Sequence, residues 1–313
     1  MNLHEHSDEF NQLIILAAKH FNIPENAVKK DYYILMVLEK LAESEYASTC
    51  IFKGGTSLSK CYPGSIERFS EDIDLTFYPD EKLTEKQYDK KLKKIEAVLS
   101  EGIRMEKIPE ERNSRNKSAY VWFDDEDYST RIKLEIGSSV KPDPYEPRAM
   151  KSYIQEFLES TDQNGAAEEY GLRSIELNVL RIERTFIDKI MSVKRHAICG
   201  TLPQKVRHIY DVTALYRRED IQTFLVDSDM LKSILEKTKS TDSFYLKKRN
   251  IAREYNPIGM YDFESWKNKF DDEIKKRYET LHNDLLYSNE KQDFNEAIAV
   301  FEKLNKRFAE IEE

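Results

Sequence analysis

The sequence predicts an α/β protein with a mainly helical C-terminal lobe. Apolar residues recur at helical spacing between residues 9 and 44, alternate with a period of two between residues 118 and 140, and return to helical spacing from Leu180 onward. Pro142, Pro144 and Pro147 interrupt regular structure between the last two patterns. We therefore expect a strand-containing core with N-terminal helices over residues 1–147 and a helical lobe over residues 148–313.

The composition is that of a globular chain that folds without disulfides. Its 313 residues are 40% hydrophobic and 34% charged, and no apolar run reaches the roughly 18 residues that cross a bilayer. Cys50, Cys61 and Cys199 form no CxxC pair, which argues against a disulfide framework and a zinc site. The acidic N-terminus lacks the features of a signal peptide, so we expect a soluble cytoplasmic protein with no membrane partner. Because the net charge is −9, a nucleic-acid partner would need a local basic patch.

The N-terminal helices are separated by Pro24, and strand and helix patterns alternate after them. In chain order the predicted elements are an approach strand at Ile51 and Phe52, a glycine pair, a helix from about Thr56 to Cys61, a turn at Pro63-Gly64, a strand over residues 73–77 and a charged helix over residues 84–99. Between Ser118 and Val140 two strands joined by the acidic turn DDEDYS predict a hairpin. In its second strand Ile132, Leu134 and Ile136 face one side, and Arg131, Lys133 and Glu135 face the other.

Two carboxylates are predicted to lie side by side. Asp72 and Asp74 are separated by one residue on a strand, so they project from the same face. Such a pair can hold a divalent cation, and Mg²⁺ prefers a few carboxylates completed by phosphate oxygens and water. Glu135, on the polar face of another strand, is the candidate for a third metal-binding acid.

The glycine pair upstream predicts a phosphate site. Gly54 and Gly55 let the backbone approach a ligand closely, and Thr56 and Ser57 open a helix whose free N–H groups favour phosphate. Each feature also has an ordinary structural interpretation: a turn for the glycines, a solvated strand face for the aspartates, and a cross-strand ion pair for Glu135. The order and spacing of the three features favour a site for a nucleoside triphosphate with Mg²⁺.

The stretch FKGGTSLSKCYPGSIERFSEDIDL resembles the first motif of the AbiEii/AbiGii-type nucleotidyltransferases, toxins of abortive-infection and type IV toxin–antitoxin systems. Four further blocks resemble the family in the expected order: KKDYYILMVLEKL, KLEI, RTFIDKIMSVKRHA and RHIYDVTALY. The resemblance implies a DNA polymerase β-like nucleotidyltransferase core and covers about Lys29 to Tyr216.

Roles for individual residues follow from this resemblance. It implies that Asp72 and Asp74 bind metal, and that Gly55 and Ser57 contact the nucleotide phosphates. Glu135 stands at the family's strand acid. The remaining matches are Lys189 and Lys194 for its paired basic residues, and Asp211 for its final acid.

The pattern around the two lysines gives a second, independent reason to single them out. Each lies within a broad apolar arc of a helix predicted over residues 180–197, where an amine needs an anionic partner or a route to solvent. A triphosphate would satisfy either amine, and snorkelling to the surface is the alternative. For Asp211 the alternative is an ion pair with Arg207 or Arg184, and we assign no role to His208.

These features predict a magnesium-dependent nucleotidyltransferase toxin that transfers a nucleotide to an acceptor, which the resemblance implies to be RNA such as tRNA. Glu135 or Asp211 could accept the acceptor's proton, and the lysines would stabilise phosphate charge. A cognate antitoxin is the expected partner. Basic and aromatic residues interleave between Lys232 and Lys276 and could contact RNA. Two alternatives stay open: transfer to a protein or small molecule, and a regulatory module that binds nucleotide without turnover.

Overall fold

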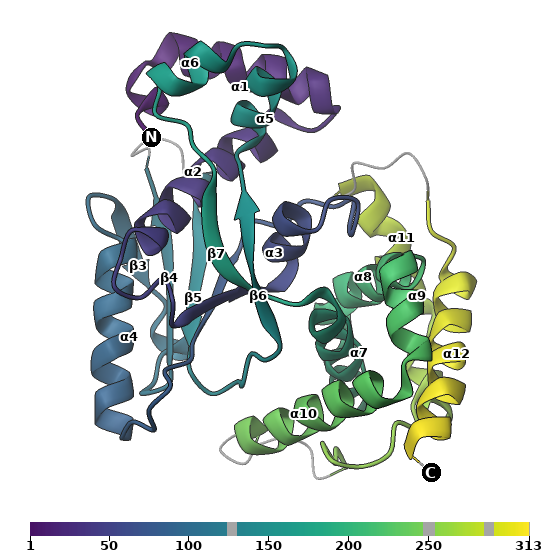
Figure 1. Cartoon of the computed structure of the whole chain (residues 1–313). Coiled ribbons are helices and arrows are strands. Elements are labelled where there is room, and N and C mark those ends of the chain that lie inside the picture. The colour runs from purple at the N-terminus through teal and green to yellow at the C-terminus, as the bar shows by residue number, and fades with distance from the viewer. Residues whose placement is uncertain (124–129, 247–253, 285–290, 313) are drawn as a thin grey trace. The chain divides into compact units, whose positions relative to one another are not determined.

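The computed structural model describes residues 1–123, 130–246, 254–284 and 291–312 (Figure 1). The predicted turn DDEDYS, residues 124–129, lies outside this range. The chain divides into two compact units. Unit 1 consists of Met1–Cys61, Phe69–Ser138 and Tyr145–Leu180, and unit 2 consists of Tyr62–Arg68, Ser139–Pro144 and Arg181–Glu313.

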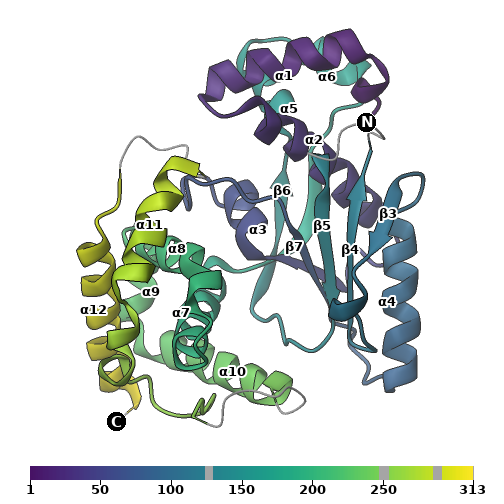
Figure 2. The same ribbon diagram turned by 180° about the vertical axis from the view of Figure 1, so that it is seen from behind.

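The described part of unit 1 contains a seven-stranded mixed sheet in the order β3-β4-β5-β2-β1-β7-β6 (Figures 1 and 2). The strands are β1 (Cys50–Lys53), β2 (Ile73–Phe77), β3 (Arg104–Lys107), β4 (Asn116–Trp122), β5 (Ile132–Gly137), β6 (Tyr145–Met150) and β7 (Ile175–Leu180). β2 pairs antiparallel with β1 and parallel with β5. The predicted strand over residues 73–77 and the predicted hairpin of β4 and β5 are confirmed.

Alternation along the central strands separates a core face from a polar face. In β5, Ile132, Leu134 and Ile136 are at most 1% exposed, whereas Lys133 and Glu135 between them are half-buried. Ile73 and Leu75 of β2 are buried in the same way. The sheet therefore presents the acids of β2 and β5 on the face opposite its apolar core.

Unit 1 also contains α1 (Ser7–Phe21), α2 (Glu25–Ala42), α3 (Gly54–Cys61), α4 (Glu85–Leu99), α5 (Tyr153–Ser160) and α6 (Asn164–Glu169). α4 begins at a capping box, in which the Thr84 hydroxyl accepts from the Gln87 N–H and the Gln87 side chain accepts from the Thr84 N–H. α3 contacts β1 and β2, the strands that it connects in sequence. The glycine pair follows β1 and the carboxylates lie at the start of β2, so the pairing of these two strands brings them close together.

The sheet extends beyond the proline-rich segment. Pro147 lies in β6, an edge strand that pairs with β7, and β7 pairs with β1. An edge strand tolerates proline because one side of its backbone needs no partner. The compact units consequently do not divide at residue 147: the chain remains part of unit 1 as far as Leu180.

The described part of unit 2 contains the α-helices α7 (Ile182–Ile198), α8 (Val206–Tyr216), α9 (Glu219–Val226), α10 (Ser228–Leu246), α11 (Asp272–Asp284) and α12 (Phe294–Glu312). This agrees with the predicted helical lobe. Rings of Phe263, Trp266, Phe270 and Phe301 pack against one another in its core. Among the described residues, no helix is both long and apolar enough to span a membrane.

Burial changes the interpretation of two aromatic residues in the segment expected to contact RNA, whereas Phe244 of the same segment is 53% exposed. Trp266 is 2% exposed and Tyr255 is 5% exposed, with the Tyr255 hydroxyl donating to Asp242. These rings are therefore core side chains and cannot stack on bases. The basic residues of that segment at positions 247, 248, 249 and 253 lie outside the described residues.

Candidate active site

Strand register brings charged side chains into one row on the polar face of the sheet. Lys53 of β1 lies opposite Asp74 of β2, and Asp74 lies beside Glu135 of β5. Side chains of directly paired residues share one face of a sheet. Asp72 precedes β2 by one residue and is half-buried, as Asp74 is.

Carboxylates crowd around Asp72. Burial raises the pKa of Asp72 to about 6, and the negative charges of Asp74, Glu71 and Glu135 act in the same direction. Within the described part of the chain, neither Asp72 nor Asp74 forms an ion pair. Two uncompensated oxygen-rich side chains beside further carboxylates are the arrangement that a hard divalent cation relieves.

Glu135 stands next to Asp74 but its carboxylate is engaged elsewhere. Its Oε1 atom lies 2.5 Å from Nζ of Lys133, which also lies 2.8 Å from Glu111. Over the residues that the structure describes, no group of three or more His, Cys, Asp or Glu side chains is arranged to hold a metal ion. The structure therefore brings Asp72 and Asp74 together and leaves Glu135 in an ion pair. Its partner Lys133 lies on the same strand, and not across the strands as the structural alternative expected.

Gly54 is required by the close approach of Asp74. The residue has a φ of +89°, and a Cβ atom there would lie 3.1 Å from Cγ of Asp74 and far inside van der Waals contact with its Oδ2 atom. Any side chain at this position would displace the carboxylate. The glycine therefore allows the start of α3 and the β2 carboxylate to adjoin each other.

The first turn of α3 is tied down by its own hydroxyl groups. Ser57 is fully buried and donates to the Gly54 carbonyl over 3.0 Å, and Thr56 donates to Ser70 over 3.1 Å. The helix begins at Gly54, two residues earlier than predicted. Its free N–H groups are consequently those of residues 54–57, which include Gly55.

A second charged cluster lies in unit 2, around Asp211 of α8. Arg68 donates to both carboxylate oxygens of Asp211, over 2.6 and 2.7 Å, and Lys189 of α7 donates to Oδ2 over 2.7 Å. Asp211 is fully buried. Although burial alone would raise its pKa, the charges of Arg68 and Lys189 hold the pKa of Asp211 below its ordinary value.

The ion-pair alternative for Asp211 was right in kind but wrong in its partners. Arg184 pairs instead with Asp188 of its own helix. His208 lies one turn before Asp211, and burial together with the charge of Lys189 lowers its pKa well below the ordinary value, so the ring is neutral. Its Nδ1 atom is buried with no hydrogen-bond partner among the described residues.

Lys194 does not join this cluster. Its ammonium donates to the Met260 carbonyl over 2.6 Å and lies 5.8 Å from the centre of the Tyr261 ring. Burial, and then the charge of Lys239, lowers the pKa of Lys194 to about 8. Lys194 follows Lys189 by five positions on α7, a spacing that points the two side chains to different sides of a helix.

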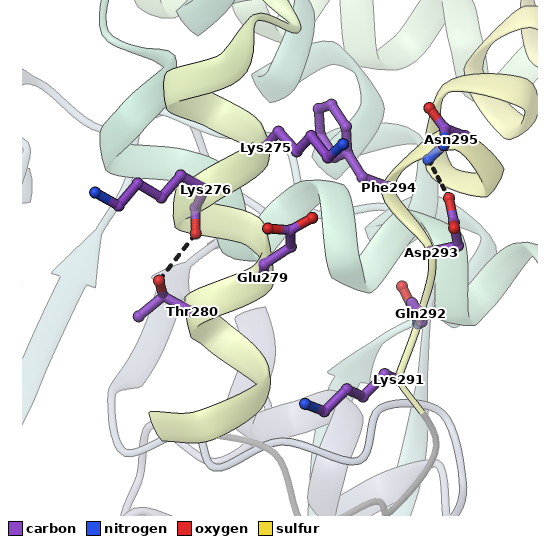
Figure 3. Close-up of a pocket in the computed structure, with 9 residues that line it drawn as sticks. All are labelled: Lys275, Lys276, Glu279, Thr280, Lys291, Gln292, Asp293, Phe294 and Asn295. Atoms are coloured by element: carbon purple, nitrogen blue, oxygen red, sulfur yellow. Dashed lines mark hydrogen bonds between the residues drawn. The ribbon is translucent and has the colours of Figure 1, made fainter.

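Unit 2 also contains a pocket of about 540 Å³ between α11 and the start of α12 (Figure 3). It is lined by Lys275, Lys276, Glu279, Thr280, Lys291, Gln292, Asp293, Phe294 and Asn295. Asp293 caps α12 by accepting from the Asn295 N–H. The three lysines form no ion pair within the described part of the chain.

Comparison with known proteins decides the family. A family model described as nucleotidyl transferase AbiEii toxin, type IV TA system, matches residues 37–300. The chain belongs to this family. MenT4, a nucleotidyltransferase toxin from Mycobacterium tuberculosis, is 16% identical with a TM-score of 0.51, over 95% of this chain and 98% of that one. JHP933 from Helicobacter pylori is 17% identical with a TM-score of 0.40, over 83% of this chain and 95% of its own. None of the curated proteins matches in sequence.

Membership in the AbiEii family confirms the resemblance in the sequence motifs and makes the protein a nucleotidyltransferase. The likeness to MenT4 shows a common fold and confirms the α/β class. The family implies nucleotide substrates and an antitoxin partner, and nucleotidyltransferases generally use a divalent metal ion.

Sequence reasoning missed two ion pairs that the structure places in these clusters. Lys30 of α2 pairs with Glu71, and Arg68 binds Asp211. Lys30 had a detectable signal, because it is a charged residue among the buried positions of a helix. The pairing of Arg68 had none, because its partner is 143 residues away in the sequence.

Proposed function

We propose that this protein is a magnesium-dependent nucleotidyltransferase that transfers a nucleotide from a nucleoside triphosphate to an RNA acceptor such as tRNA. The observation that carries the proposal is the pairing of Asp72 and Asp74 beside Gly54 at the start of α3. An acceptor hydroxyl attacks the α-phosphorus, the bond from that phosphorus to the bridging oxygen of the β-phosphate breaks, and pyrophosphate leaves.

The carboxylates fit the implied metal. Asp72 and Asp74 offer hard oxygen ligands with no ion-pair partner among the described residues, and burial together with the neighbouring carboxylates raises the pKa of Asp72. A bound Mg²⁺ would stabilise the charge that develops on the phosphate oxygens. Two carboxylates do not fill the coordination sphere of Mg²⁺, but this number is typical of sites in which phosphate oxygens and water supply the remaining ligands.

We assign the triphosphate to the N-terminus of α3. The free N–H groups of residues 54–57 and the positive end of the helix favour phosphate oxygens. Gly54 keeps this end of the helix open next to Asp74. The hydroxyl groups of Thr56 and Ser57 hold the turn in shape by internal hydrogen bonds, so we assign the phosphate contacts to backbone groups.

Lys189 is proposed to stabilise the negative charge of a phosphate, and Asp211 is proposed to hold the Lys189 side chain in position. Asp211 is fully buried and accepts three hydrogen bonds from two cations, which makes it a poor proton acceptor. Lys189 stands at one of the paired basic positions of the family's motif, and an ammonium group stabilises the negative charge of a phosphate. Lys194, bonded to a backbone carbonyl in a separate contact, is assigned a structural role in place of the phosphate role expected from the motif.

An RNA acceptor is favoured by the lysine-lined pocket of unit 2. Lys275, Lys276 and Lys291 border it without ion-pair partners among the described residues, although the whole molecule carries a charge of −9. Basic side chains of this kind neutralise backbone phosphates. Converting the three lysines to Glu should weaken RNA binding and make the residual binding less dependent on salt, while nucleoside triphosphate binding stays unchanged.

The proposal is tested by incubating the protein with radiolabelled nucleoside triphosphates and either total RNA or total protein. Label in RNA supports the proposal, label in protein moves the acceptor to another class, and no label with retained nucleotide binding indicates a module without turnover. Expression of the intact chain in a bacterium should slow growth, and Lys189→Ala should relieve the effect. Unimpaired growth at high expression of active enzyme would contradict the toxin assignment.

A further inference from the structure

Four carboxylates gather at the beginning of β2, and two lysines divide them into two pairs. Glu71 and Asp72 directly precede the strand, and Asp74 on the strand is in register with Glu135 of β5. Glu71 is paired with Lys30, and Glu135 is paired with Lys133. Asp72 and Asp74 have no such partner among the described residues.

Lys30 is a largely buried lysine on α2. Its side chain is 9% exposed, its ammonium contacts Glu71, and it lies 5.8 Å from the centre of the Phe69 ring. The next residue, Asp31, is also buried and lies 3.0 Å from Lys60 near the end of α3. Consecutive residues of α2 therefore hold the segment that enters β2 and the helix that precedes it.

Lys133 is held between two acids. Its ammonium lies 2.5 Å from Glu135 and 2.8 Å from Glu111, and it is 23% exposed. Glu135 is in register with Asp74, and its carboxylate is paired with Lys133. The described residues accordingly contain no group of three acids arranged to hold a metal ion.

We propose that Lys30 and Lys133 are positioning residues that set how many carboxylates reach the divalent cation. By binding Glu71 and Glu135, they leave a site of two carboxylates with positions open for phosphate oxygens and water. A site with more carboxylates would bind the bare cation more tightly and prefer larger cations with more oxygen ligands. The inference rests on the proposed function in one respect, that Asp72 and Asp74 hold the cation.

The test is a titration of the full chain with Mn²⁺ in the absence of nucleotide. The concentration of free Mn²⁺ is measured by electron paramagnetic resonance. Lys133→Met should tighten Mn²⁺ binding about tenfold, since an uncompensated unit charge about 8 Å from a divalent ion at an effective dielectric constant of about 60 changes affinity by that factor. Lys30→Met should act in the same direction. The double variants Lys133→Met/Glu135→Gln and Lys30→Met/Glu71→Gln should return to the affinity of the parent.

Arg131→Met is the matched control for charge, because Arg131 immediately precedes the same strand and pairs with Glu106. It should change Mn²⁺ affinity less than twofold. Glu71→Gln and Glu135→Gln preserve shape and provide a second test should a lysine variant fold poorly. Each removes one unit charge but no metal ligand and should weaken Mn²⁺ binding by at most about tenfold, whereas Asp72→Asn and Asp74→Asn remove a ligand as well and should lose about 100-fold or more.

The outcomes separate the inference from the function on which it rests. Three results would overturn the sorting role: unchanged affinity in Lys133→Met, an equal gain in Arg131→Met, or a loss in Glu71→Gln and Glu135→Gln as large as that in Asp72→Asn. A parent protein that binds no Mn²⁺ at millimolar concentration would instead overturn the metal site itself.

Discussion

Replacing Gly54 by Ala tests the geometry of the site with one methyl group. The added Cβ would lie 3.1 Å from Cγ of Asp74 and much closer to its Oδ2 atom, so the carboxylate must move. A displacement of about 1 Å in a reacting arrangement costs about 100-fold in rate. We therefore expect nucleotidyl transfer to fall about 100-fold or more.

The substitution has a second effect, which a control variant isolates. A φ of +89° is unfavourable for Ala and costs about 1–2 kcal/mol of stability. Gly102 of unit 1 has a φ of +71°, and a Cβ atom added there would meet nothing within 4 Å, so Gly102→Ala carries the same kind of backbone strain without the clash. Both variants should lose a few degrees in melting temperature, and only Gly54→Ala should lose activity.

The assay is incorporation of radiolabelled nucleotide into total RNA, with melting temperature measured by circular dichroism. Gly54→Ala with activity equal to that of Gly102→Ala would refute the reasoning, because it would mean that the position of the Asp74 carboxylate does not matter. Equal losses of activity in both variants would assign the effect to backbone strain.

Three further predictions concern unit 2. Asp211→Asn should destabilise the protein by about 3–5 kcal/mol, measured by urea unfolding, because it leaves the buried charges of Arg68 and Lys189 without their anion. The pKa of Asp211 is lowered in the native state, so its contribution to stability is complete above the unfolded pKa of about 3.9 and is lost as pH falls towards the native value. Acid unfolding curves of Asp211→Asn should lack this loss. The same dependence of stability on pH in both proteins would contradict the assignment. Lys189→Met should reduce nucleotide transfer at least about tenfold in the label assay, whereas Lys194→Met should change stability and leave the transfer rate per folded molecule within about twofold. A larger loss of transfer in Lys194→Met than in Lys189→Met would assign the phosphate contact to Lys194. Because burial lowers the pKa of Lys194 to about 8, the parent should gain stability as pH rises from about 8 to about 10.5, and Lys194→Met should not.

Much of the site can be predicted from sequence because its parts are local. The spacing of Asp72 and Asp74 on a strand, and the glycine pair before a helix, depend on residues close together in the chain, and the structure places Gly54 against Asp74. Alternation in β5 likewise predicts the face on which Glu135 lies. Local periodicity is enough in each case.

What the sequence does not predict depends on pairing across the sheet and on burial. The pattern places Lys133 and Glu135 on one face but leaves Glu135 open between a metal and an ion pair, and the structure shows its carboxylate paired with Lys133. The prolines predict a boundary at β6 because proline breaks a strand pattern, yet an edge strand accommodates Pro147. Trp266 looks like a ring available to RNA because its neighbours in sequence do not reveal its burial in the aromatic core.

The central claim is that Asp72 and Asp74 form the metal-binding pair of a working nucleotidyltransferase, and one comparison tests it most directly. The parent, Asp72→Asn and Asp74→Asn are incubated with radiolabelled nucleoside triphosphates, total RNA and Mg²⁺, and the label transferred is counted alongside melting temperature. We predict transfer by the parent, loss of at least about 1,000-fold in both variants, as expected when a metal clamp is lost, and melting temperatures within about 3 °C of the parent. Retained transfer, or unfolding of both variants, would contradict the claim.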